Sequence, residues 1–114
     1  MLLFFADEDV WMALPEGERA TAIARIGEWY GQQARAGRIV EGRRLTGLRE
    51  ATTVRLGPAG RSGKPLITDG PFAETKEALG SYAVIEAPDR ETALAVAASW
   101  PGGGAVEVRP VMEE

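Results

Sequence analysis

Apolar residues recur along the chain with two different periods. In four short segments, residues 2–6, 39–45, 80–86 and 106–109, apolar side chains form short runs or alternate with polar ones. This pattern is typical of β-strands, because successive side chains of a strand point to opposite faces of a sheet. In two longer segments the apolar residues recur every three or four positions, which predicts two amphipathic helices.

The two predicted helices have recognisable ends. The first begins at Pro15, which suits a first helical turn, and ends at Gly37, a residue type that is common just after a helix. The second begins at Asp89, which we expect to cap its N-terminus, and is stopped by Pro101. The residues expected to face the core are Ala20, Ile23, Ile26, Gly27, Tyr30 and Ala34 in the first helix and Ala93, Val96, Ala97 and Trp100 in the second.

The order of these elements predicts the fold class. Residues 52–56 and 66–68 are two further strands on either side of a glycine-rich loop, residues 57–63, and we expect a β-hairpin with a mobile tip. Residues 7–9 predict a polar loop. Of two interpretations of Trp11, packing of the loop onto the domain is favoured over a role as the cover of a pocket. Without the hairpin the order is βαββαβ, an α+β, ferredoxin-like fold. Its two helices cover one face of the sheet, so we expect a homodimer to cover the other.

Composition narrows the classes of function. The 114 residues, 45% of them apolar, suffice for one domain, which we place at residues 1–114. The chain has no cysteine and no histidine. This excludes disulfides, thiolate nucleophiles, Ser-His-Asp triads, and zinc sites that use either residue type. No group of acidic residues has the spacing of a metal-binding loop, so we expect neither a metal site nor a cofactor.

The net charge and the N-terminal segment limit the classes of partner that we expect. The formal net charge is −4, and the arginines between residues 35 and 49 are diluted by Glu41 and Glu50. We therefore expect no nucleic-acid partner, because such proteins concentrate basic residues against the phosphates. The apolar residues 1–6 are too few for a membrane span or a signal peptide, and acidic residues follow them at once. We expect a cytoplasmic protein without a membrane partner.

Residues 66–77 place a constrained backbone beside charged side chains. Asp69, Gly70 and Pro71 predict a rigid turn, because proline fixes its own φ and glycine tolerates angles that other residues avoid. An aspartate in such a turn can accept hydrogen bonds from the amides that follow it. One interpretation is a structural turn that ends a strand. The other is a functional site built on that turn.

The charged residues after the turn favour a site. If residues 72–77 are extended, Phe72, Glu74 and Lys76 share a face. If they form a helical turn, Glu74 meets Glu77 instead. In a small-molecule site Asp69 is the candidate catalytic residue, acting as a general base or a polar anchor. In this site Lys76 holds an anionic group of the ligand, and Glu74 orients the Lys76 side chain. Because the chain lacks imidazole, a basic carboxylate here has to be desolvated. The candidate ligand-binding residues are Thr53, Arg55, Phe72, Glu74 and Lys76.

The same residues resemble the signature of a known family. Asp69-Gly70-Pro71-Phe72 follows Ile67-Thr68 and precedes Ala73-Glu74-Thr75-Lys76-Glu77 and Leu79-Gly80, as in YCII-related proteins with a DGPF domain. The resemblance extends over nearly the whole chain, including residues 2–6, 51–55 and 106–110. It implies a dimeric α+β barrel, in which two ferredoxin-like sheets face each other. It also implies a bacterial intracellular protein, often encoded beside extracytoplasmic-function sigma factors.

The resemblance leaves the activity open. Related proteins are proposed to use a histidine–aspartate pair, which this chain cannot form because it has no histidine. Three hypotheses remain. The protein binds, and in an enzyme transforms, a small molecule at the Asp69 turn. Alternatively, it is a non-catalytic partner module associated with a sigma factor, with exposed tryptophan or arginine residues at the contact. In the third, the turn shapes the dimer alone.

Overall fold

The computed structural model describes residues 1–57 and 63–113 and divides the chain into two compact units. The first unit contains Met1–Leu45 and Lys76–Glu114, and the second contains Thr46–Thr75. The Asp-Gly-Pro-Phe turn lies in the second unit. The expected single domain over residues 1–114 stays a prediction.

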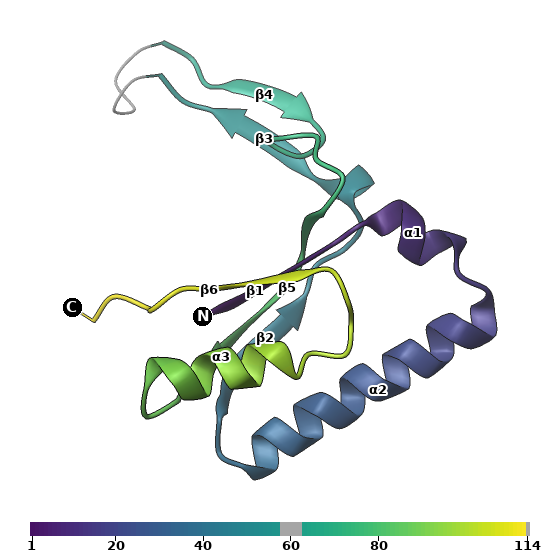
Figure 1. Ribbon diagram of the computed structural model, residues 1–114. Coiled ribbons are helices and arrows are strands. Elements are labelled where there is room, and N and C mark those ends of the chain that lie inside the picture. Colours follow the sequence, from purple (N-terminus) through teal and green to yellow (C-terminus); the bar gives the residue numbers. More distant parts are fainter. Residues whose placement is uncertain (58–62, 114) are drawn as a thin grey trace. The chain divides into compact units, whose positions relative to one another are not determined.

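The first unit is built on a four-stranded antiparallel sheet (Figure 1). β1 lies inside the sheet, with Leu2 opposite Ala83 on one side and opposite Val108 on the other. This strand order, with two helices on one face of the sheet, is the ferredoxin-like α+β fold that the sequence predicts. The described residues form no closed barrel. The strands are β1 (Leu2–Ala6), β2 (Ile39–Arg44), β5 (Ala78–Ile85) and β6 (Ala105–Val108), in the spatial order β2-β5-β1-β6.

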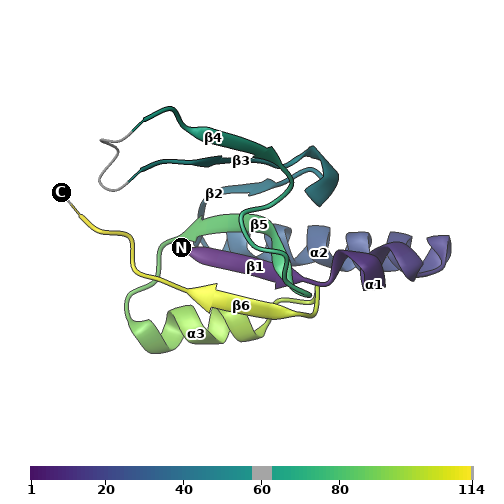
Figure 2. The same ribbon diagram turned by 90° about the horizontal axis from the view of Figure 1, so that it is seen from above.

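Two helices, α2 (Glu16–Arg35) and α3 (Arg90–Ala98), lie on one face of this sheet, as Figure 2 shows together with Figure 1. Their ends confirm the sequence prediction. Gly37, just after α2, has a φ of 72°, and the Asp89 carboxylate accepts a hydrogen bond from the backbone N–H of Thr92 at 2.7 Å. None of the helices in the described part of the chain is both long and apolar enough to cross a membrane.

The hydrophobic core lies between the sheet and these two helices. Alternation along β1 directs Leu2 and Phe4 toward the helices, and both are buried. Phe4 stacks on Trp100 with ring centroids 4.0 Å apart, and Trp29 meets both rings edge-on. The indole N–H of Trp29 donates to Ser99 Oγ at 2.8 Å, so its polar atom is satisfied inside the core. The buried set is Leu2, Phe4, Trp29, Ala83, Val96 and Ala97.

The face that α2 presents to the core differs in part from the predicted one. The helix buries Trp29, which the prediction omitted, whereas Ile23 is 50% exposed. Ala22 and Ile26 are half-buried and precede Trp29 at helical spacing. The predicted stripe was right at Ile26 and at Tyr30, which packs against the core, and wrong at Ile23. The large indole ring of Trp29 decides which side of the helix faces the sheet. Ala20, Gly27 and Ala34, also predicted to face the core, are exposed.

A short helix, α1 (Glu8–Ala13), replaces the polar loop expected after β1. Asp7 caps it, and its carboxylate accepts hydrogen bonds from the backbone N–H groups of Asp9 and Val10 at 3.0 and 3.2 Å. The loop prediction was wrong because an acidic run read as a strand end also supplies an N-cap and a favourable first turn. Trp11 on α1 lies under the guanidinium of Arg44, 5.9 Å from the ring centroid.

The second unit is a β-hairpin preceded by one helical turn. The turn is η1 (Leu48–Glu50), and the strands are β3 (Thr52–Arg55) and β4 (Leu66–Asp69). They pair antiparallel, with Thr52 opposite Asp69 and Arg55 opposite Leu66. The hairpin predicted from the sequence is confirmed. Of its predicted mobile tip, residues 58–62 lie outside the described residues.

Candidate functional site

Both backbone polar groups of Gly70 bond the Asp-Gly-Pro-Phe turn to Ala51 and Thr53, at the start of β3. The Gly70 N–H donates to the carbonyl oxygen of Ala51 at 2.8 Å, and its own carbonyl accepts the hydroxyl of Thr53 at 2.7 Å. Gly70 has a φ of 100°, where a side chain would be strained. Thr53 is the buried residue of the hairpin, with 9% of its surface exposed. Two hydrogen bonds and the glycine backbone angle therefore define the conformation of the turn.

The residue after this turn meets the end of β3. The guanidinium carbon of Arg55 lies over the ring of Phe72, 5.0 Å from its centroid. The Phe72 side chain is nevertheless 71% exposed, and Arg55 is exposed as well. Among the described residues, no carboxylate forms an ion pair with Arg55. The pair therefore offers solvent an unneutralised positive charge beside an aromatic ring.

The strand register separates Asp69 from this pair. Asp69 lies opposite Thr52, and side chains opposite one another share a face of the hairpin. Thr53 and Arg55 alternate with Thr52 and so lie on the other face. The structure thus brings Thr53, Arg55 and the Phe72 turn together, and it places the Asp69 carboxylate on the opposite side of the ladder. Asp69 is exposed, and its catalytic role stays a prediction.

The two remaining predicted residues follow the turn. Glu74 belongs to the second unit and Lys76 to the first, and both are exposed. Residues 71–77 are neither strand nor helix, so the extended and helical alternatives considered for this segment are both absent. No cluster of acidic side chains suited to a metal ion occurs within residues 1–57 and 63–113.

One polar pair marks the sheet face that α2 and α3 leave uncovered. The hydroxyl of Tyr82 on β5 donates to Glu41 Oε1 on β2 at 2.9 Å. This bond is the main cause that raises the pKa of Tyr82. Desolvation and the negative charge of Glu41 also raise it, and the positive charge of Arg43 lowers it.

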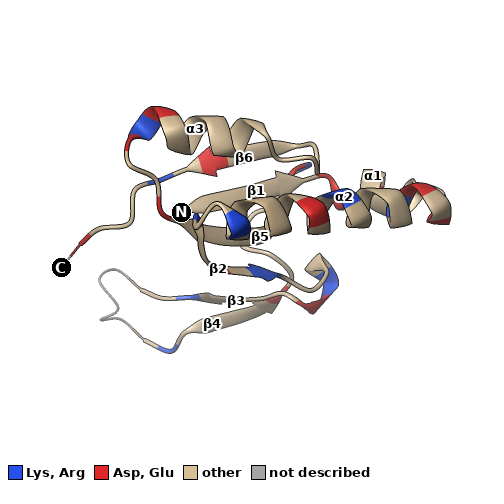
Figure 3. Cartoon of the chain, turned by 90° about the horizontal axis from the view of Figure 1, so that it is seen from below, with Lys and Arg blue, Asp and Glu red and all other residues tan. Residues whose placement is uncertain are grey.

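On the helices, acidic and basic residues are interspersed along α2 and at the start of α3 (Figure 3).

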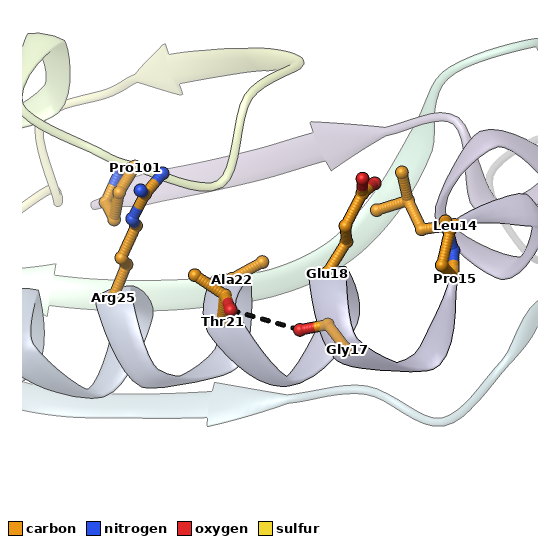
Figure 4. Close-up of a pocket in the computed structure, with 8 residues that line it drawn as sticks. All are labelled: Leu14, Pro15, Gly17, Glu18, Thr21, Ala22, Arg25 and Pro101. Atoms are coloured by element: carbon orange, nitrogen blue, oxygen red, sulfur yellow. Dashed lines mark hydrogen bonds between the residues drawn. The ribbon is translucent and has the colours of Figure 1, made fainter.

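A pocket of about 600 Å³ in the first unit contains none of the predicted site residues. It runs along the first half of α2, and Figure 4 shows Glu18 and Arg25 projecting to the same side of the helix. Sequence reasoning missed it, although residues 18, 22 and 25 have the spacing of one face of α2. Its lining residues are Leu14, Pro15, Gly17, Glu18, Thr21, Ala22, Arg25 and Pro101.

Comparison with known proteins agrees with the motif. The model of the YCII-related domain matches residues 2–114. An uncharacterized protein of Rhizobium meliloti (strain 1021) is 30% identical in an alignment that covers 96% of this chain and 89% of that protein. A match over nearly the whole chain fits the ferredoxin-like sheet and the hairpin that carries the Asp-Gly-Pro-Phe turn. The chain therefore belongs to the YCII-related domain family.

Proposed function

We propose that the protein binds a small anionic molecule with a flat apolar group at its hairpin unit. The observation that carries the proposal is the Arg55–Phe72 pair, in which a guanidinium without a carboxylate partner among the described residues lies over an exposed ring. Guanidinium groups bind carboxylates through two parallel hydrogen bonds, and aromatic rings stack on flat ligands. Thr53 supports the site indirectly, because it holds the turn that presents Phe72.

The proposal requires only that the site binds a ligand. A catalytic role for Asp69 would extend it. Asp69 is exposed in the single chain, whereas a carboxylate that acts as a base near neutral pH has to be desolvated. A ligand or a second chain that excludes water from the turn would supply that desolvation. The roles expected for Asp69 as base or anchor, and for Glu74 and Lys76 with an anionic group, are part of the same extension.

Benzoate is a suitable first probe, since it combines a ring with a carboxylate. We expect it to shift the backbone NMR signals of residues 51–56 and 70–73 in the full chain. Acetate and benzyl alcohol, which each lack one of the two features, should bind more weakly. Arg55→Gln and Phe72→Leu should weaken benzoate binding, whereas Lys64→Gln, in the same unit, should not. Equal binding by wild type and Arg55→Gln would refute the proposal.

The extension needs a separate test. A metabolite screen by thermal shift, run in parallel on the wild type and on Asp69→Asn, identifies ligands that depend on the carboxylate. We expect at least one anionic metabolite to stabilise the wild type more than Asp69→Asn. If every stabilising metabolite acts equally on both proteins, Asp69 is a turn residue without a part in binding.

The second candidate is a non-catalytic partner module associated with an extracytoplasmic-function sigma factor in the cytoplasm. Exposed apolar side chains on the hairpin favour it, because contiguous apolar surface often marks a protein interface. The test is a pull-down with an extracytoplasmic-function sigma factor from the same organism, using the wild type and Ile67→Lys. Absence of capture by the wild type would contradict this candidate. The exposed apolar residues that share one face are Val54 and Ile67, which lie opposite one another in the ladder.

A homodimer is the partner proposed for the uncovered face of the four-stranded sheet. Alternation places Leu3 and Phe5 of β1 on that face, and Tyr82 lies opposite Leu3. A second copy would bury this apolar strip. Light scattering should give the mass of a dimer for the wild type, and Leu3→Lys should give a monomer. A monomeric wild type at micromolar concentration would rule the dimer out.

A further inference from the structure

The pocket along α2 is a groove with small residues at its base. Gly17 and Ala22 lie along the helix, and Leu14, Pro15 and Pro101 supply apolar walls at the two ends. Because glycine and alanine fill little volume, about 600 Å³ stays open above this part of the helix. That volume lies within the range of ordinary small-molecule sites, roughly 300–1,000 Å³.

Few polar groups remain for a ligand in this groove. The hydroxyl of Thr21 donates to the carbonyl oxygen of Gly17 at 3.0 Å, so its proton is already used. Glu18 and Arg25 are the two charged lining residues, and both are exposed. Neither forms an ion pair with another described residue. The groove therefore presents one negative and one positive charge, both available.

The two charges lie at different ends of the groove. Glu18 and Arg25 are seven residues apart, which is about 10.5 Å along an α-helix. Figure 4 shows the Glu18 side chain beside Leu14 and the Arg25 side chain beside Pro101, with Ala22 between them. A complementary ligand therefore carries a positive group and a negative group separated by an apolar stretch of about the same length.

We propose that this groove binds the two free ends of a short apolar peptide. Its terminal ammonium pairs with Glu18, its terminal carboxylate pairs with Arg25, and its side chains cover Ala22 and the apolar walls. An extended peptide spans about 3.3–3.6 Å per residue, so a tripeptide matches the separation of the charges. The site shares no residue with the hairpin site, and either proposal stands if the other fails.

The test uses the full chain and the tripeptide leucyl-alanyl-leucine, followed by NMR. The free peptide should shift the backbone signals of residues 14–25, 100 and 102. Acetylation of its N-terminus and amidation of its C-terminus should each weaken binding about threefold, as expected for single exposed charge pairs. Glu18→Gln should bind the free and acetylated peptides alike, and Arg25→Gln should bind the free and amidated peptides alike. Glu28→Gln, elsewhere on α2, should behave as the wild type.

A second pair of variants tests the groove itself without changing its charge. Ala22→Leu places a large side chain in the groove and should abolish the peptide-induced shifts. Ala24→Leu, an exposed position on the same helix, should leave them unchanged. The proposal is overturned if both leucine variants bind alike, if capped and free peptides bind the wild type equally, or if the shifts fall outside these residues.

Discussion

The hydroxyl of Thr53 donates to the backbone carbonyl of Gly70 across 2.7 Å, and this bond fixes the Asp-Gly-Pro-Phe turn against β3. Thr53 is buried to 9% exposure in a unit whose strands are otherwise exposed. A two-stranded hairpin is only marginally stable by itself in water. The threonine therefore acts as an internal tie that lets a small unit present Arg55 and Phe72 in a fixed arrangement.

Replacing Thr53 by valine should loosen the turn. The change keeps the shape of the side chain but leaves the Gly70 carbonyl without its donor, which costs about 1–2 kcal/mol. The loss should be local, so hydrogen exchange at the Gly70 amide should accelerate while amides in β1 and β5 keep their rates. Thr52→Val, at the neighbouring exposed position, is the matched control and should leave the Gly70 amide unchanged. Equal exchange in the two variants would contradict the tie.

The face of α2 that meets the sheet can be tested by two alanine variants. Trp29→Ala removes a buried ring that contacts Phe4 and Trp100, and it should lower the free energy of unfolding by about 3–5 kcal/mol. Ile23→Ala, at a half-exposed position, should cost less than about 1 kcal/mol. Urea denaturation measures both. If Ile23→Ala costs as much as Trp29→Ala, the helix presents the face predicted from periodicity alone.

Much of the fold follows from the sequence because local signals agree with one another. The apolar run after Met1, the cap at Asp89 and the glycine at position 37 each mark an element that the structure contains. The side of α2 that faces the core follows only in part, at Ile26 and Tyr30, because alanine and glycine fit many stripes. Trp29 buries more apolar area than these small residues, so it decides which side of the helix faces the sheet. The helix α1 was missed because Asp7 reads equally as a strand end and as an N-cap.

The candidate site was predictable in its location on the chain but not in its arrangement. Turn chemistry pointed to Asp69, Gly70 and Pro71, and the structure has a rigid turn there. The register of β3 and β4 places Asp69 and Arg55 on opposite faces, and that register depends on pairing across a glycine-rich connection. The groove on α2 was missed because it depends on Pro101, which is distant in sequence.

Alkaline pH should destabilise the protein through its tyrosines. The pKa of Tyr82 is raised mainly by its hydrogen bond to Glu41, and burial raises the pKa of Tyr30. A tyrosine whose pKa is higher in the folded than in the unfolded state contributes to stability at pH values below the unfolded-state pKa, which is the ordinary tyrosine value. The stabilisation is lost as pH rises from that value through the folded-state pKa. Glu41→Gln should shift the Tyr82 titration toward its ordinary value and leave Tyr30 unchanged, as followed by NMR of the tyrosine rings.

The control for this titration is Glu107→Gln, which removes a carboxylate that no described bond joins to Tyr82. It should leave both tyrosine titrations in place. A Tyr82 titration that is the same in the wild type and in Glu41→Gln would show that the negative acceptor does not hold the phenol proton.

Alanine substitutions at two neighbouring glycines distinguish the cost of backbone strain from the cost of a steric collision. Gly103 and Gly104 have φ values of 72° and 71°, so an alanine at either position adopts the same unfavourable angle, at a cost of about 1–2 kcal/mol. A Cβ at Gly103 would meet nothing within 4 Å, whereas one at Gly104 would collide with the carbonyl oxygen of Phe5. Phe5 pairs with Ala105, so this collision would push β1 and β6 apart. Gly104→Ala should therefore cost about 1–3 kcal/mol more than Gly103→Ala in urea denaturation. Equal losses would mean that the two strands yield without cost, and that their close approach is not what requires glycine there.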